Sequence, residues 1–194
     1  MYRGEGPQTQ ASFSRNAAAA GEHILHFYSS ESDLLDTLSA YVGGGLIAGE
    51  SVIVIATPEH LRALRYRLEG TEADLIRAMF EDRYITLEAS VALTSFLVED
   101  VPDERLFEEM ARTLLRRACV SNRRVRAFGE MVALLWARGN REGTVRLEQL
   151  WDKFCRNRGV TLLCSYPKTA FPDSLPSHAR KAESDIRAAH SLTI

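Results

Sequence analysis

The sequence has no long hydrophobic run. No apolar stretch approaches the roughly 20 residues that a membrane-spanning helix needs, and the N-terminus lacks the charged start and hydrophobic core of a signal peptide. We therefore predict a cytoplasmic protein that makes no direct contact with a membrane.

Cysteine is scarce, with three residues in a chain of 194. Cys119, Cys155 and Cys164 form an odd set without the spacing of metal ligands, and Cys155 and Cys164 lie in apolar surroundings. Such a pattern is typical of reduced, buried thiols in a cytosolic protein. We predict no metal and no cofactor.

An excess of charge of one sign is also missing, since 24 Lys and Arg residues stand against 26 Asp and Glu residues. The basic pair Arg116 and Arg117 follows several acidic residues on the same expected helix, which indicates a solvated helix face rather than a phosphate-binding patch. The chain is not predicted to bind nucleic acid directly. Its composition, with 45% hydrophobic and 26% charged residues, suits one globular domain.

The common motifs of nucleotide-binding and hydrolytic enzymes are absent. A P-loop would need glycines and a lysine after the first strand, but residues 28–33 read Tyr-Ser-Ser-Glu-Ser-Asp, with two acids that would repel phosphate. Residues 43–45, a run of three glycines, follow a helix rather than a strand, so they do not form a dinucleotide fingerprint. The sequence also has no Gly-x-Ser-x-Gly and no His-Glu-x-x-His. We predict that the chain is not an enzyme and has no catalytic residues.

What the sequence does contain is an alternation of short apolar runs and amphipathic helices. Strands are expected at residues 23–28, 51–57, 84–89, 125–130 and 161–166. The run at 51–57 has no polar alternation, which is typical of a strand covered on both faces. The glycines at 43–45 and 49 are expected to weaken and then end the helix before it.

Strands and helices in this order predict an α/β fold, a three-layer sandwich with a mostly parallel central sheet. Residues 1–21 are expected to be a disordered tail and residues 22–171 the folded domain. Residues 172–194 are expected to be a C-terminal extension that docks on that domain through Ile186, Ala189 and Leu192.

Polar and aromatic side chains collect at the expected carboxyl ends of these strands, where open α/β sheets bind ligands. Glu130 stands out because it interrupts an apolar run, between Phe128 and Met131, and a buried carboxylate needs a purpose or a partner. We predict a small-molecule site there. Its residues would be His26, Tyr28, Thr57, His60, Glu88, Glu130 and Tyr166.

Several of these residues have a simpler explanation. His26 suits a hydrogen-bonded core residue, and Tyr28 and Tyr166 suit packing with their hydroxyls at the surface. His60 could lie exposed in the first turn of its helix. Glu88 is equally compatible with a role in the site and with none.

The order of several short segments resembles the MEDS domain, a methanogen and methylotroph sensory domain first noted in a dichloromethane-responsive transcription regulator. The segments that carry the resemblance are His26-Phe27-Tyr28, Gly45-Leu46, Gly49-Glu50, Ile55-Ala56-Thr57-Pro58-Glu59-His60, Ala127 to Trp136 with its Phe-Gly-Glu-Met core, Leu147 to Trp151, and Leu163-Cys164-Ser165-Tyr166-Pro167. The match extends from about His23 to Pro167, and we expect it to continue to His190-Ser191, so that it covers nearly all of the ordered chain.

The resemblance implies a RecA-like or Rossmann-like domain that has lost the phosphate-binding loop and senses small organic compounds. The family's motif positions carry over to His26, Tyr28, Thr57, His60, Glu130 and Tyr166, whereas Glu88 departs from the Asp that the family leads us to expect. Family members are often joined to DNA-binding, histidine-kinase or anti-sigma-type modules, and we expect this chain to lack such an output module.

The leading hypothesis is therefore a stand-alone sensory or regulatory domain that binds a small organic molecule and signals through a separate partner, such as a kinase, an anti-sigma-type protein or a transcription regulator. A homodimer is compatible with this hypothesis. The alternative is a ligand-free protein-interaction module derived from a degenerate RecA-like ATPase. A third hypothesis, a hydrolase or lyase, would require Glu130 and His60 within hydrogen-bond reach around an open space.

Overall fold

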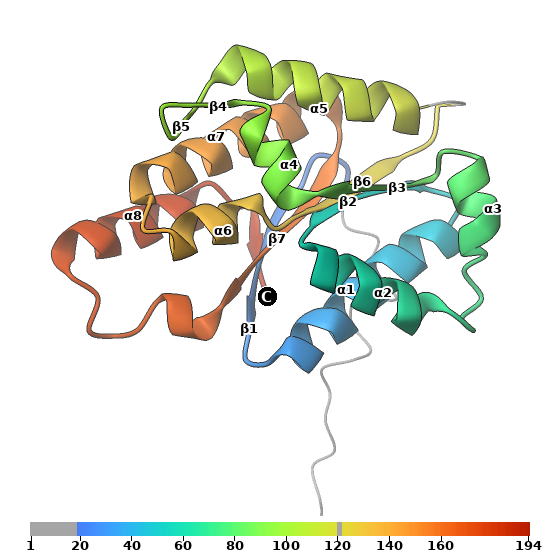
Figure 1. The fold of residues 1–194 in the computed structure, drawn as a ribbon, viewed down its shortest axis with the longest axis horizontal. Helices are drawn as coiled ribbons and strands as arrows, with labels where there is room; N and C mark the ends of the chain where they lie inside the picture. Colours follow the sequence, from blue (N-terminus) through green and yellow to red (C-terminus); the bar gives the residue numbers. More distant parts are fainter. Residues whose placement is uncertain (1–18, 120–121) are drawn as a thin grey trace, which may run out of the picture.

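A computed structural model of the protein describes residues 19–119 and 122–194. A central parallel sheet carries helices on both faces, so the fold has three layers (Figure 1). This confirms the predicted α/β sandwich with a mostly parallel sheet. Most of the expected N-terminal tail, residues 1–18, lies outside the described residues.

Six strands form the main sheet in the order β3-β2-β6-β7-β1-β8, and every neighbouring pair is parallel. The strands are β1 (His23–Tyr28), β2 (Ser51–Ala56), β3 (Tyr84–Glu88), β6 (Val125–Gly129), β7 (Thr161–Pro167) and β8 (Leu192–Thr193). The first five agree with the predicted strands to within one residue at each end. A short antiparallel hairpin of β4 (Leu97–Val98) and β5 (Val101–Pro102) was not predicted.

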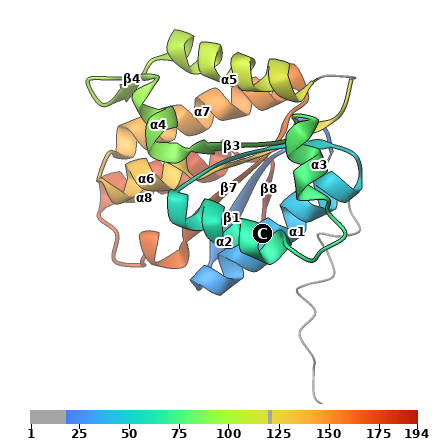
Figure 2. The ribbon, with the colours of Figure 1, turned by 45° about the vertical axis from the view of Figure 1, so that its right-hand side comes forward.

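Helices α1, α2 and α3 cover one face of the sheet, and α4 to α8 cover the other (Figures 1 and 2). Their bounds are α1 (Glu31–Ile47), α2 (Pro58–Leu68), α3 (Leu75–Phe80), α4 (Ala89–Thr94), α5 (Glu104–Ala118), α6 (Met131–Ala137), α7 (Arg141–Arg158) and α8 (Ser177–Ala188), with a 3-10 turn at Lys168–Ala170. In the described part of the chain, none of these helices has the length and apolar character needed to cross a membrane.

Strand β2 shows why its sequence has no polar alternation. Val52 and Val54 pack into the core beneath α1 and α2, whereas Ile53 and Ile55 pack into the core beneath the helices of the opposite face. Successive side chains of a strand point to opposite faces, so a strand that is covered on both sides must be apolar at every position.

Helix α1 corrects the expected effect of its glycines. The helix continues through residues 43–45 to Ile47, and only Gly49, with φ of +78°, follows its end. Gly45 is needed for packing, because a Cβ there would lie 2.7 Å from Cδ of Arg126. Arg126 is held in turn by the buried Glu50 carboxylate and by the carbonyl of Tyr41, to which it donates a 3.0 Å hydrogen bond.

Two neighbouring glycines of α1 should therefore respond in opposite ways to replacement by alanine. Gly45→Ala would push the anchored Arg126 side chain away and should lower the free energy of unfolding by about 1–2 kcal/mol. Gly44→Ala meets nothing within 4 Å and should raise it by about 0.5–1 kcal/mol through helix propensity. Urea unfolding measures both, and equal effects of the two changes would contradict this account.

Candidate functional site

The predicted site lies where the parallel strands end. Neighbouring β2 and β6 are in register, with Ile55 opposite Gly129, so the residues that follow these strands meet at one edge of the sheet. The backbone N–H of Glu130 donates to the carbonyl of Ile55 at 2.9 Å, and the backbone N–H of Thr57 donates to Oε2 of Glu130 at 2.8 Å. Glu130 thus links the ends of two strands at the carboxyl edge, where ligands bind in open α/β sheets.

His60 contacts two carboxylates at once. Its Nδ1 lies 2.7 Å from Oε1 of Glu130, at an angle outside that of a regular hydrogen bond. Its Nε2 contacts Oε1 of Glu31 at the start of α1. The Thr57 hydroxyl caps α2 by accepting the His60 backbone N–H at 3.4 Å, and this cap fixes where the imidazole projects. We call Glu31, His60 and Glu130 the rim bridge.

The rim bridge holds its histidine in the charged state. The contact with Glu130 raises the pKa of His60 most, burial opposes it, and the charges of Glu130 and Glu31 add to the rise, giving a pKa of about 8. The His60 and Glu130 side chains are 12% and 10% exposed, whereas that of Glu31 is 61% exposed. The contact between Glu31 and His60 is therefore the part of the rim bridge that breaks most easily.

Two further predicted residues lie at the end of β1. His26 is buried, with Nδ1 3.2 Å from the Ser165 hydroxyl and Nε2 3.5 Å from the Thr37 hydroxyl, and burial lowers its pKa. Tyr28 is half-buried; burial, followed by the charges of Glu130 and Glu31, raises its pKa to about 12. Tyr28 therefore keeps its proton and offers a donor beside the acidic residues.

The remaining two predicted residues do not join the rim bridge. Tyr166 is fully buried, and its hydroxyl donates to Oε1 of Glu148 on α7 at 2.6 Å. The pleat explains this, because Ser165 faces His26 and the next side chain must point to the opposite face. Glu88 accepts a hydrogen bond from Ser90, and its described contacts do not reach Glu130.

Two groups of polar residues were not predicted from the sequence. Glu31 was expected only to repel phosphate, although its side chain completes the rim bridge. The other group is a buried polar cluster of four side chains, which we call the interior cluster: His23, Glu148, Cys164 and His190. One sequence signal was present, because Glu148 lies on the buried side of α7 with Leu147 and Trp151.

A cavity of about 390 Å³ opens beside the end of β7, and its volume falls in the range of small-molecule sites. Its lining includes the buried Trp136 and Tyr166, and the Arg141 guanidinium stacks 3.7 Å from the centre of the Trp136 ring. The cavity runs along α6, which begins directly after Glu130. Its lining is Ala133, Trp136, Ala137, Arg141, Tyr166, Pro167, Thr169, Ala170, Pro172 and Leu175.

Comparison with known proteins identifies a family and a fold. The family model described as the MEthanogen/methylotroph, DcmR Sensory domain matches residues 22–182. No curated protein gave a match.

Two similar solved structures support the RecA-like fold. A KaiC-like protein from Pyrococcus horikoshii OT3 has a TM-score of 0.57 at 13% identity, covering 88% of this chain and 70% of its own. The flagellar accessory protein FlaH from Methanocaldococcus jannaschii has a TM-score of 0.56 at 8% identity, covering 93% and 73% respectively.

The rim bridge predicts a specific dependence of stability on pH. Because the pKa of His60 rises from 6.5 to about 8 on folding, its contribution is fully present below pH 6.5 and is lost as the pH rises through 8. With a discount for the exposed Glu31, the loss should be about 1 kcal/mol. The contribution of His60 is the difference in the free energy of unfolding between wild type and His60→Asn, measured as a function of pH. A His60 imidazole whose pKa by NMR is 6.5 or lower would contradict the raised pKa.

Proposed function

Because the chain belongs to the MEDS sensory-domain family, we propose that it binds a small organic molecule at the rim bridge and in the cavity along α6, and that it signals through a separate partner protein. The observation that carries the proposal is the rim bridge itself. Its buried Glu130 and charged His60 lie at the edge where a parallel sheet collects ligand-binding groups, and α6, which begins directly after Glu130, contributes Ala133 and Trp136 to the cavity.

The chemistry of this edge argues against a phosphate ligand. The first turn of α1 carries the acids Glu31 and Asp33, and its hydrogen bonds are internal: Asp33 accepts the Ser29 backbone N–H at 2.8 Å, and Ser30 accepts that of Asp33 at 3.2 Å. A phosphate would meet carboxylates where a P-loop offers N–H groups and lysine. A neutral or cationic organic molecule that donates a hydrogen bond to Glu130 suits the site better.

Signalling by this site requires that the ligand bind two states of the rim with different affinity. A molecule that donates to Glu130 competes with His60 for the same carboxylate. His60 joins the first turn of α2 to the first turn of α1 through Glu31, so releasing it would remove one of the polar contacts between these helices and leave the pair of Arg67 and Asp36 further along them. The partner protein would read that change.

Catalysis is not part of the proposal, although Glu130 and His60 are close enough for proton transfer. Both imidazole nitrogens of His60 contact carboxylates, and its raised pKa keeps it protonated near neutral pH, which makes it a poor general base. The sequence also offers none of the nucleophile motifs that such a pair would activate.

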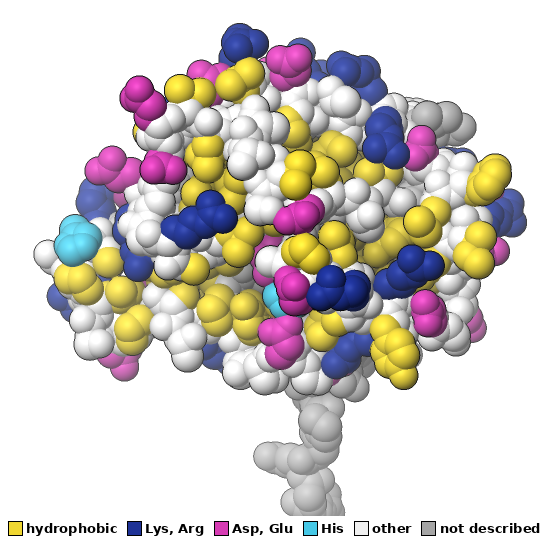
Figure 3. All heavy atoms as spheres, viewed as in Figure 1, with side chains coloured by type: hydrophobic (Ala, Val, Ile, Leu, Met, Phe, Trp, Pro, Cys, Tyr) yellow, Lys and Arg dark blue, Asp and Glu magenta, His cyan; other side chains and the backbone are white. Residues whose placement is uncertain are grey.

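One observation favours a protein-interaction role, either with the ligand or in its place. Ile76, Met79 and Phe80 of α3 are exposed, Phe80 to 95%, and their spacing puts them on neighbouring positions of the helix surface. Figure 3 shows acidic and basic side chains interspersed over the visible face, with apolar side chains reaching the surface on the side of α3. Exposed apolar groups of this kind are common in protein interfaces.

The test compares two carboxylates at the same edge of the sheet. Thermal unfolding of wild type, Glu130→Gln and Glu88→Gln would be followed across methanol, methylamines and short-chain alcohols, which the family name suggests. A stabilising compound should lose about tenfold in affinity in Glu130→Gln, about 1.4 kcal/mol, because the amide nitrogen cannot accept the ligand's hydrogen bond. Glu88→Gln should bind as wild type does, since Glu88 is bonded to Ser90.

Equal ligand stabilisation in all three proteins would remove Glu130 from the site. A panel without any stabilising compound would favour the ligand-free interaction module, and substitution of Phe80 by serine would then be the variant to test against a partner.

A further inference from the structure

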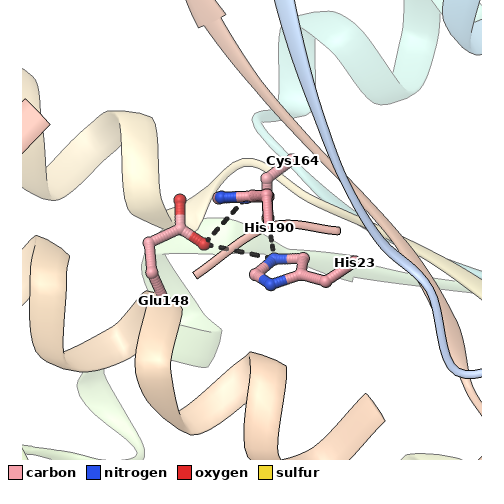
Figure 4. A group of neighbouring side chains, drawn as sticks. All are labelled: His23, Glu148, Cys164 and His190. Atoms are coloured by element: carbon pink, nitrogen blue, oxygen red, sulfur yellow. Dashed lines mark hydrogen bonds and ion pairs between the residues drawn. The ribbon is translucent and has the colours of Figure 1, made fainter. Parts of the chain in front are cut away.

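The interior cluster brings together four side chains of metal-binding types from four parts of the chain. His23 comes from β1, Glu148 from α7, Cys164 from β7, and His190 from the segment between α8 and β8 (Figure 4). All four side chains are fully or almost fully buried, with exposures of 0–1% for His23, Glu148 and His190. No part of this cluster belongs to the rim bridge.

Three distances between ligand atoms of the cluster are close to those in a coordination shell. Nε2 of His23 lies 3.2 Å from Oε2 of Glu148 and 3.3 Å from Sγ of Cys164, and Nε2 of His190 lies 3.4 Å from the same Oε2. No two of the four ligand atoms are more than 4.8 Å apart. Neighbouring ligand atoms around a tetrahedral zinc ion are about 3.3–3.7 Å apart, given bonds of 2.0–2.3 Å.

The tautomers leave lone pairs facing one another. Nδ1 of His23 lies 3.0 Å from the carbonyl of Ala189, and Nδ1 of His190 lies 2.7 Å from the carbonyl of Ile186. A carbonyl oxygen only accepts, so each Nδ1 carries the proton, and in a neutral ring Nε2 is an acceptor. Both Nε2 atoms then point at an acceptor oxygen of Glu148.

The thiol resolves part of this conflict, because Sγ of Cys164 lies 3.3 Å from Nε2 of His23 and can donate its S–H to that lone pair. The Nε2 lone pair of His190 still faces the carboxylate. Two added protons would place two positive imidazole rings with their centres 3.8 Å apart in the interior. Oε2 of Glu148 and Nε2 of His190 have no hydrogen-bond partner among the described residues, although both side chains are 0% exposed. Buried polar atoms of this kind call for a partner.

We propose that the interior cluster binds a divalent transition metal ion, with zinc as the best match. The ion would be held by Nε2 of His23, Nε2 of His190, Oε2 of Glu148 and Sγ of Cys164, which is the mixed nitrogen, oxygen and sulfur set that zinc accepts. A thiolate and a carboxylate carry two negative charges, so the complex with a divalent ion would be neutral, as a fully buried site requires.

The surroundings of the cluster match those of metal sites. Both histidines donate their Nδ1–H to a backbone carbonyl, and the Tyr166 hydroxyl donates to the other oxygen of Glu148, so hydrogen bonds fix the orientation of three of the four ligands. Burial raises the pKa of the Cys164 thiol, and a bound cation would overcome this by removing the proton.

The location also gives the ion a structural role. His190 follows α8 and precedes β8, and the Ser191 backbone N–H donates to the His23 carbonyl at 2.8 Å. A metal that joins His190 to β1, α7 and β7 would hold the C-terminal segment against the sheet. Loss of the metal should release that segment first.

The test measures binding by the untagged full-length chain, freed of metal with a chelator and then titrated with Co²⁺ and Zn²⁺. Wild type should bind one ion per chain and show the charge-transfer absorption of a cobalt thiolate. Cys164→Ala should lose this absorption, and His190→Gln should lose at least tenfold in affinity. Cys155→Ala is the matched control, because Cys155 is equally buried but lies outside the cluster.

A second readout guards against variants that fail to fold. Circular dichroism must show native secondary structure, and proteolysis in the metal-free protein should cut first near residues 177–194. Wild type that binds neither ion, or Cys164→Ala and His190→Gln that bind cobalt as wild type does, would overturn the proposal. None of these outcomes depends on the rim bridge or on an organic ligand.

Discussion

The structure depends on one constraint: a parallel sheet covered on both faces has no water to solvate a charge, so every carboxylate in its interior needs its own positive partner. Three acids are buried among the residues that the structure describes. Glu50 contacts Arg126 and Glu130 contacts His60, whereas Glu148 lies against His23 and His190 and is the carboxylate for which we propose a metal ion as the positive partner.

The contacts of each buried acid fix the position of a different element of the fold. Arg126 lies against Gly45, so the Glu50 pair decides how closely α1 approaches the sheet. The Glu130 pair fixes the beginning of α2 relative to the end of β6. The contact between Glu148 and His190 holds the C-terminal segment against the sheet, where β8 pairs with β1. Burial of charge thus specifies geometry at three separate places, independently of the apolar core.

Much of the fold could be predicted from sequence, because strands covered on both faces leave uninterrupted apolar runs, as at residues 51–57. The meeting of Thr57, His60 and Glu130 also followed from the parallel order and from the proline that opens α2. The rest depends on tertiary contacts. The role of Gly45 depends on Arg126, which is distant in sequence, and the direction of Tyr166 depends on a single step of the pleat. The interior cluster draws one residue from each of four elements, so no local spacing reveals it.

The fold determines where a ligand can bind, and the side chains at that place determine which kind of ligand suits it. A RecA-like sheet supplies an edge where ligands bind, whichever side chains the chain places there. In this chain, acids occupy the start of α1 and a protonated histidine joins them to the end of β6, so the edge has the opposite electrostatic character to a phosphate site. Strand β7 carries polar side chains on both faces of the sheet: Ser165 faces His26, and the residues on either side of it, Cys164 and Tyr166, face the interior cluster. Polar contacts on the two faces are therefore one residue apart along this strand, which is the closest approach of the interior cluster to the predicted site residue His26.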